Sequence, residues 1–239
     1  MTVLILLAVL AFGWALFEQY AAPQTEVPPE DQAILAETQQ HDPDSLIRAA
    51  DALGQLAVRE RVSRDGYARD QFSSGWARVE GCDMRNRILQ RDLEEVKLDD
   101  DDCTVLSGVL VDGPFTGKTI PFQRGPDTSG DIHIEHLVAV SDAWQKGAQD
   151  LSREQRHAFF NDPLNLVAVD GPANMEKGDA DASDWLPHRP YRCPYVARQI
   201  AIKLKHDLWV TQSEHAAMSR VLGTCPNQLL PIEREVVTP

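Results

Sequence analysis

Four cysteines spread widely along 239 residues restrict the folds open to this chain more than any other feature. None of Cys82, Cys103, Cys193 and Cys225 forms a C-x-x-C pair of the kind that structural zinc sites use. In an oxidising compartment an even number of cysteines indicates disulfides, and four cysteines allow three pairings. Proximity along the chain favours Cys82–Cys103 and Cys193–Cys225. Four free, buried thiols are the alternative if the chain stays in the cytoplasm.

The N-terminal residues indicate which compartment applies. Val3 to Phe17 is an uncharged, apolar run that is shorter than the roughly 20 residues of a membrane span. Residues 1–22 are therefore expected to be a signal peptide or an uncleaved membrane anchor, with a buried core helix as the less favoured alternative. No basic residue precedes the run and Pro23 follows Ala21-Ala22, so cleavage stays open. We expect a secreted or extracytoplasmic protein, which contacts a membrane only if this segment is retained.

Composition predicts one globular domain behind that segment. The chain is 43% hydrophobic and 25% charged, which is ordinary for a soluble domain. Residues 23–42 are acidic and rich in proline, and are expected to be a flexible linker. Residues 43–225 form the expected domain, and 226–239 a loose tail.

The formal net charge of −14 conceals a local basic stretch. From Trp185 to His206 the chain has no acidic residue, and it carries Arg189, Arg192, Arg198, Lys203 and Lys205. Local charge, not the total, decides whether a protein can hold a polyanion. We therefore expect this stretch to follow a nucleic-acid backbone, with Arg198 and Lys205 as the contacts that share one side of a helix. Ordinary solvated charges are the alternative.

Hydrophobic periodicity predicts an α+β chain without regular alternation of strands and helices. Ser152 with Gln155, and Thr211 with Glu214, have the spacing of capping boxes. Helices are expected over 44–62, 85–96, 152–161, 194–208 and 211–223, and strands over 105–111, 118–122, 133–140 and 165–169.

Residues 131–187 concentrate the polar side chains that carry chemistry. Glu135-His136 leads into an apolar strand, Asn165 precedes a second strand, and Asn174 opens a helix after a Gly-Pro turn. This order resembles the HNH, or ββα-metal, endonucleases. A longer stretch of the sequence is similar to an exported bacterial HNH family. It runs from Tyr67-Ala-Arg-Asp through HIEHLVAVSDAWQKGA and NDPLNLVAVDGPANMEKGD to WLPHRPYRCPYVARQIAIK. That family is grouped with the C-terminal nuclease domain of GmrSD restriction enzymes.

The resemblance implies a ββα-metal core embedded in a mostly helical single domain that is stabilised by disulfides. It also implies roles for four residues. Glu135 and the amide of Asn174 would bind one divalent metal, expected to be Mg²⁺ with Mn²⁺ able to substitute. His136 would be the general base that activates water, and Asn165 would orient it through a backbone or ring hydrogen bond. The usual acid at the metal position in the family is Asp, and Glu135 is one methylene longer.

Three neighbouring residues could also contribute to the site. Asp131 is expected to be a turn residue, with support of the metal ligands as the minority view. His133 is expected on a solvated strand face, although it could be a further ligand. Lys177, in the first turns after Asn174, could reach a phosphate or could simply be solvated.

These patterns predict a metal-dependent endonuclease that hydrolyses DNA, with RNA as a possible substrate and no obligate protein partner. Little sequence specificity is expected, because no separate base-reading module fits in this length. A catalytically degenerate HNH-type domain that binds at the cell envelope is the first alternative. A zinc hydrolase that uses His133 and His136 is the second.

Overall fold

The computed structural model describes residues 47–231, and the fold is given for these residues alone. The expected export signal (1–22), the linker (23–42) and the end of the tail (232–239) lie outside them. The α-helices are α3 (Ala49–Leu53), α4 (Met84–Asp92), α5 (Val140–Gln145), α6 (Arg153–Phe160), α7 (Gly171–Lys177), α8 (Arg192–Lys205) and α9 (Gln212–Leu222). The strands are β1 (Arg78–Val79), β2 (Cys82–Asp83), β3 (Glu94–Leu98), β4 (Val105–Leu110), β5 (Ile120–Gln123), β6 (Ile132–His136) and β7 (Leu166–Asp170). Short 3₁₀ turns occupy Arg69–Gln71, Ala148–Asp150 and Arg189–Tyr191.

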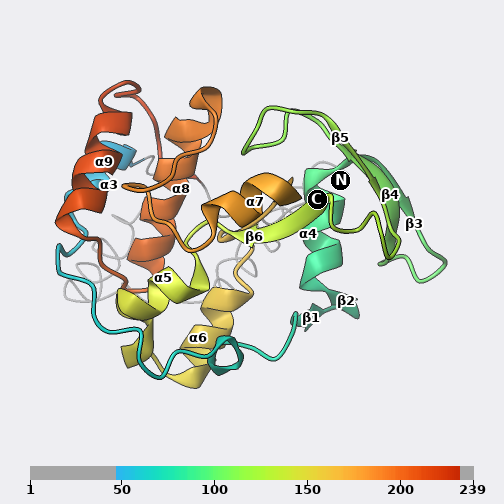
Figure 1. Cartoon of the computed structure of the whole chain (residues 1–239), viewed down its shortest axis with the longest axis horizontal. Coiled ribbons are helices and arrows are strands. Elements are labelled where there is room, and N and C mark those ends of the chain that lie inside the picture. The colour runs from blue at the N-terminus through green and yellow to red at the C-terminus, as the bar shows by residue number, and fades with distance from the viewer. Residues whose placement is uncertain (1–46, 232–239) are drawn as a thin grey trace, which may run out of the picture. The chain divides into compact units, whose positions relative to one another are not determined.

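Two groups of elements flank the β6–β7 pair. On one side α3, α8 and α9 pack on one another, and on the other lies the antiparallel sheet β3-β4-β5 (Figure 1). Helix α4 contacts β4, β6 and β7, so it joins that sheet to the central pair. Helix α7 follows β7 directly and packs on both strands of the pair. The centre of the described chain is therefore two antiparallel strands covered by the helix that follows them.

The apolar residues form two cores that meet at the central pair. The smaller one holds Ile132 and Ile134 of β6 with Leu166 and Ala168 of β7, against α4 and the three-stranded sheet. The larger one is built from α3, α5, α6, α8 and α9 and includes Val167 and Val169, which face the other way from β7. All five residues of β7 are buried, because both of its faces are covered.

Both expected disulfides are present. Cys82–Cys103 ties the start of α4 to the loop before β4, with the Cα atoms 5.4 Å apart. Cys193–Cys225 ties the first turn of α8 to the chain after α9, with the Cα atoms 6.5 Å apart. In the chain-entropy account, loops of 21 and 32 residues are each worth about 3 kcal/mol of stability.

Most of the expected elements are confirmed, and the errors have physical causes. The helix expected over 85–96 ends at Asp92, because Glu94–Leu98 pairs with β4 as a strand. The strand expected over 133–140 ends at His136, after which the chain turns into α5. Within the described residues, the helix expected over 44–62 is only Ala49–Leu53, and Gly54 ends it.

The capping-box prediction holds in full at Ser152 and Gln155. At the second site only half is seen: Thr211 accepts from the backbone nitrogen of Glu214, while the Glu214 side chain turns inward to buried lysines. Between residues 47 and 231 no helix combines the length and apolar character needed to cross a bilayer.

Candidate active site

Strand β6 divides the candidate residues between its two faces. Ile132 and Ile134 enter the smaller core, whereas His133 and Glu135 lie on the side covered by α7. His136 ends the strand, is 3% exposed, and continues the face of the two isoleucines. Adjacent residues therefore present a carboxylate and an imidazole in different directions, as the two-residue period of a strand predicts.

A backbone carbonyl fixes the imidazole of His136. Its Nε2 lies 2.8 Å from the carbonyl oxygen of Phe160, and because a carbonyl only accepts, Nε2 carries the proton. Trp76 stacks on the ring with an interplanar angle of 11°, and the Phe160 ring lies 4.6 Å away between centroids. Burial lowers the pKa of His136 to about 3, and the positive charges of Arg69 and Lys177 add to the shift. The ring is neutral at pH 7, so Nδ1 offers a lone pair that can accept a proton.

Asn165 acts on the backbone that follows His136, not on its ring. Its side-chain oxygen accepts from the nitrogen of Val138 at 2.9 Å, and its side-chain nitrogen donates to the oxygen of Val138 at 3.3 Å. The Leu137 nitrogen donates to the backbone oxygen of Asn165 at 2.8 Å. These bonds turn the chain away from the sheet directly after His136. Of the two expected modes, a backbone or a ring hydrogen bond, the structure shows bonds of Asn165 to the backbone, while the ring bond of His136 goes to Phe160.

Lys177 is an internal ion-pair partner of Glu135. Its Nζ lies 2.7 Å from Oε1 of Glu135 and 3.4 Å from the backbone oxygen of His136, and its side chain is 0% exposed. Lys177 is therefore not solvated, and its ammonium group is held by Glu135. Lys177 instead neutralises the carboxylate and holds it beside α7.

Asn174 lies on the same face as Glu135 and His133. Its side-chain nitrogen is 3.2 Å from Nδ1 of His133, while its side-chain oxygen is buried with no hydrogen-bond partner among the described residues. A buried, unpaired acceptor is costly, so its retention indicates a partner that binds there. This oxygen and the Glu135 carboxylate are hard ligands, and Mg²⁺ commonly uses one or two carboxylates plus water. The donor set therefore fits a magnesium-type ion.

The described residues contain no group of three or more His, Cys, Asp or Glu side chains that could hold a metal. His133 and His136 lie on opposite faces of β6, so they do not converge on one ion. The structure therefore does not bring together the two histidines that the zinc alternative would use. His133 instead positions Asn174, which makes it more than a solvated strand residue.

A small cavity of about 110 Å³ joins the two chemical groups. Glu135 and His136 both line it, together with Tyr67, Arg69, Ala139, Val140, Ser141, Gly178 and Asp179. A second cavity of about 340 Å³ is lined by Arg69, Ser73, Trp76, Phe160 and their neighbours. A separate cavity of about 600 Å³ is lined by Val79, Met84, Ile88, His157, Asn161 and others, and contains none of the four central candidates. We place the chemistry at the small cavity, because only there do the imidazole and the carboxylate meet.

Four groups without a role in the sequence analysis either line this cavity or hold the His136 ring. Tyr67, Arg69 and Trp76 come from the segment before β1, and the Phe160 carbonyl ends α6. The segment Tyr67-Ala-Arg-Asp is part of the sequence that resembles the nuclease family. Its residues could therefore have been considered for the site, but the sequence analysis assigned them no role. The Phe160 carbonyl carries no sequence signal, because any residue supplies one.

Comparison with known proteins identifies the family. The model of the C-terminal domain of GmrSD restriction endonucleases matches residues 83–221. The chain belongs to this family. An "Uncharacterized secreted protein" of Arthroderma benhamiae is 35% identical over 185 residues, which cover 76% of this chain and 86% of the relative. No solved structure matches this chain.

Membership of the GmrSD C-terminal domain family indicates a nuclease. The matched region contains Glu135, His136, Asn165 and Asn174, whereas Arg69 and Trp76 precede it. The family match does not confirm the exported bacterial group that the resemblance suggested.

The basic stretch is divided between the interior and the surface: Lys203 is buried, whereas Arg189 and Lys205 are exposed. The Arg198 guanidinium donates to the carbonyl oxygens of Pro163, Leu164 and Leu166 at 2.6–3.0 Å. Burial lowers the pKa of Arg198, and its Nε and Nη2 donate to backbone carbonyls, so the structure does not present this side chain as the phosphate contact that the sequence suggested. Lys205 pairs with Asp162 at 3.1 Å.

Asp131 is an exposed turn residue, as expected. Its backbone oxygen accepts from the nitrogen of Gly171 at 2.9 Å, which fixes the start of α7 against β6. A Cβ on Gly171 would meet the Gly130 oxygen at 2.2 Å, so only glycine permits this approach.

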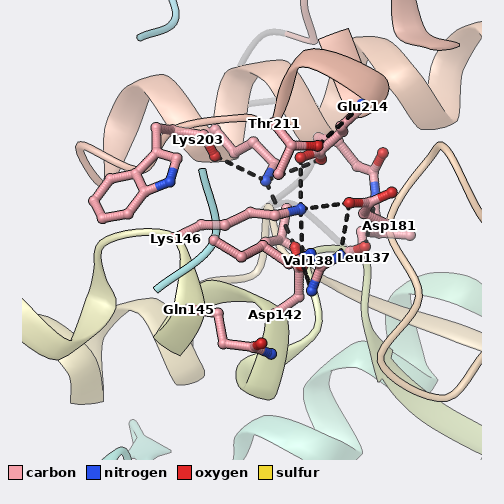
Figure 2. Close-up of polar contacts among 12 residues, drawn as sticks. Leu137, Val138, Asp142, Gln145, Lys146, Asp181, Lys203, Thr211 and Glu214 are labelled. Carbon is pink, nitrogen blue, oxygen red and sulfur yellow. Dashed lines mark hydrogen bonds and ion pairs between the residues drawn. The ribbon is translucent and has the colours of Figure 1, made fainter. Parts of the chain in front are cut away.

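A buried charge cluster supports the chain on which the cavity is built. Lys146 Nζ lies 2.8 Å from Asp142, 2.6 Å from Asp181 and 2.6 Å from Glu214 (Figure 2). Lys203 contacts Glu214 at 3.0 Å, and Arg61 contacts Asp142 and Asp181 at 3.0 and 2.7 Å. Three bases thus face three acids, and the cluster ties α5, α8, α9 and the loop after α7 together. Lys203 is consequently not among the residues that could contact a nucleic-acid backbone.

Proposed function

We propose that this protein is a metal-dependent endonuclease of the HNH type that hydrolyses phosphodiester bonds of DNA with little sequence preference. The observation that carries the proposal is the state of His136. A neutral imidazole donates through Nε2 to a fixed carbonyl, and His136 lines a cavity together with Glu135. With Nε2 used as a donor, Nδ1 is the ring nitrogen that would accept a proton from water, which is the role of a general base.

His136 would take a proton from a water in this cavity through Nδ1. The resulting positive charge would rest on a ring whose Nε2–H already donates to Phe160, so the ring need not move. Trp76 stacking and the Phe160 contact would hold the ring in place during the transfer. Asn165 would keep the turn at Val138 rigid, and so would fix where the strand ends.

Glu135 and Asn174 would hold one divalent cation, which we propose to be Mg²⁺, with Mn²⁺ able to substitute. When bound, the ion would neutralise negative charge on the scissile phosphate. Two features support these ligands: the unpaired side-chain oxygen of Asn174 and the position of Glu135 on the same face of β6. Lys177 would limit the negative charge of the site before substrate arrives.

We propose that the protein acts outside the cytoplasm. The two disulfides, and a relative whose name describes a secreted protein, support this location. A membrane tether is not part of the proposal, because it would depend on residues 1–22, which the structure does not describe.

The test is a plasmid-nicking assay of the purified protein with Mg²⁺, with Mn²⁺ and with EDTA. We expect nicking that needs the metal and that His136→Ala lowers by at least about 100-fold, the usual worth of a general base. His215→Ala, at a half-exposed histidine of α9, is the matched control and should keep full activity. DNA binding without cleavage under all metal conditions would instead favour the degenerate binding domain.

A further inference from the structure

Arg69 is an exposed cation at the edge of the candidate active site. It lines the 110 Å³ cavity with Glu135 and His136, and also the adjoining 340 Å³ cavity with Ser73 and Trp76. It is the residue common to the two cavities.

The guanidinium is positioned by an aromatic ring and not by an acid. Its Cζ lies 4.9 Å from the centroid of Phe160, the residue whose carbonyl holds His136. Within residues 47–231 no carboxylate forms an ion pair with Arg69, whereas Arg61, Arg64 and Arg87 all pair with acids. Its charge is close enough to act on the His136 ring. A cation held on a ring face keeps its donors available for an anion.

We propose that Arg69 binds the scissile phosphate and that the cavity beside Trp76 receives the adjoining nucleotide, an inference that rests on the proposed nuclease function. A guanidinium can donate two parallel hydrogen bonds to phosphate oxygens. The 340 Å³ volume lies at the lower end of the range for small-ligand sites, which suits a single nucleotide unit.

Other cations near the site are less suitable for this role. Lys177 is buried against Glu135, and Arg198 is committed to three carbonyl oxygens. In a protein with a net charge of −14, an exposed cation beside the candidate base is the feature that can attract a polyanion locally. Arg69 therefore replaces the basic stretch of α8 as the proposed phosphate contact.

The experiment compares Arg69→Gln and Arg69→Lys with a control, Arg153→Gln. Arg153 is exposed at the opposite end of the helix that carries Phe160, and it lines neither cavity. In nicking assays we expect Arg69→Gln to lower kcat/KM by about 10- to 100-fold, the loss of a charge-assisted contact. Arg69→Lys should keep part of the activity, and Arg153→Gln all of it. Equal kcat/KM in Arg69→Gln and the control would overturn the proposal.

A binding measurement separates this inference from the proposed function. Anisotropy of a fluorescent 12-nucleotide DNA strand is followed against salt, with Mg²⁺ present, in the His136→Ala background. Adding Arg69→Gln should weaken binding and reduce the salt slope by about 0.7, the worth of one contact with a single strand. An unchanged slope would overturn the subsite even if wild type cuts DNA. If wild type cuts nothing, a slope reduced only by Arg69→Gln still supports the subsite while the nuclease proposal fails.

Discussion

Replacing Lys146 by methionine should destabilise this protein more than any surface change. Lys146 Nζ touches three carboxylates at 2.6–2.8 Å, and its side chain and theirs are at most 3% exposed. Methionine keeps the length of the side chain, so the substitution removes the charge and leaves little cavity. The three acids of the cluster would then face only Arg61 and Lys203, which leaves one uncompensated buried charge.

The expected loss is about 3–5 kcal/mol at pH 7, the usual cost of leaving one partner of a buried ion pair alone. The loss should also depend on pH. Burial alone would raise the pKa of Asp181, but Lys146 outweighs burial and holds that pKa well below its ordinary value. Wild type therefore keeps the contribution of Asp181 until the pH falls below about 4. Without Lys146 three buried acids share two bases, so we expect one of them to take up a proton above its unfolded pKa and the variant to recover stability as the pH falls from 7 towards 5.

Urea denaturation with the disulfides intact measures both effects, at pH 7 and at pH 5. Lys118→Met, at an exposed lysine, is the control and should change the free energy of unfolding by less than about 0.5 kcal/mol. The double variant Lys146→Met/Asp181→Asn restores equal numbers of acids and bases, so its loss should be smaller than the sum of the single losses. A loss below about 1 kcal/mol, or one that is the same at both pH values, would refute this account of the cluster.

Three further outcomes follow from the contacts of the site. Lys177→Met should leave the Glu135 carboxylate without its counter-charge, and so tighten Mg²⁺ binding while it lowers the melting temperature. Calorimetry measures the affinity for Mg²⁺, and weaker binding would contradict the role assigned to Lys177. Asn165→Ala should cost about 2–4 kcal/mol, because two backbone groups of Val138 lose buried partners, as urea denaturation will show. Replacing Cys193 and Cys225 together by Ser should cost about 3 kcal/mol; an unchanged denaturation midpoint would exclude a stabilising role for this bridge.

The sequence was informative where a local pattern had only one physical reading. Strand β7 follows from an apolar run, α6 from its capping box, and the division of Glu135 from His136 from strand alternation. The disulfide partners followed from proximity along the chain, which is a rule about loop closure and not about the fold.

What the sequence did not show depends on contacts between distant segments. The carbonyl that holds His136 comes from Phe160, 24 residues later, and the stacked Trp76 comes from a segment 60 residues earlier. Arg198 was misread for the same reason: a guanidinium on a helix looks solvated until the carbonyls 32–35 residues away are placed against it. Charge in a sequence does not show whether the fold will use it internally.

The division of roles across β6 explains why the site needs both cores. Ile132 and Ile134 fix the strand against α4, and the turn at Val138 ends it, so the position of His136 depends on the smaller core and on Asn165. The opposite face depends on α7, which places Asn174 and Lys177 against His133 and Glu135. A change that shifts α7 would therefore disturb the candidate metal ligands and leave the tautomer of His136 intact. A change at Phe160 or Trp76 would do the reverse, so the two halves of the chemistry are separable by mutation even though they meet in one small cavity.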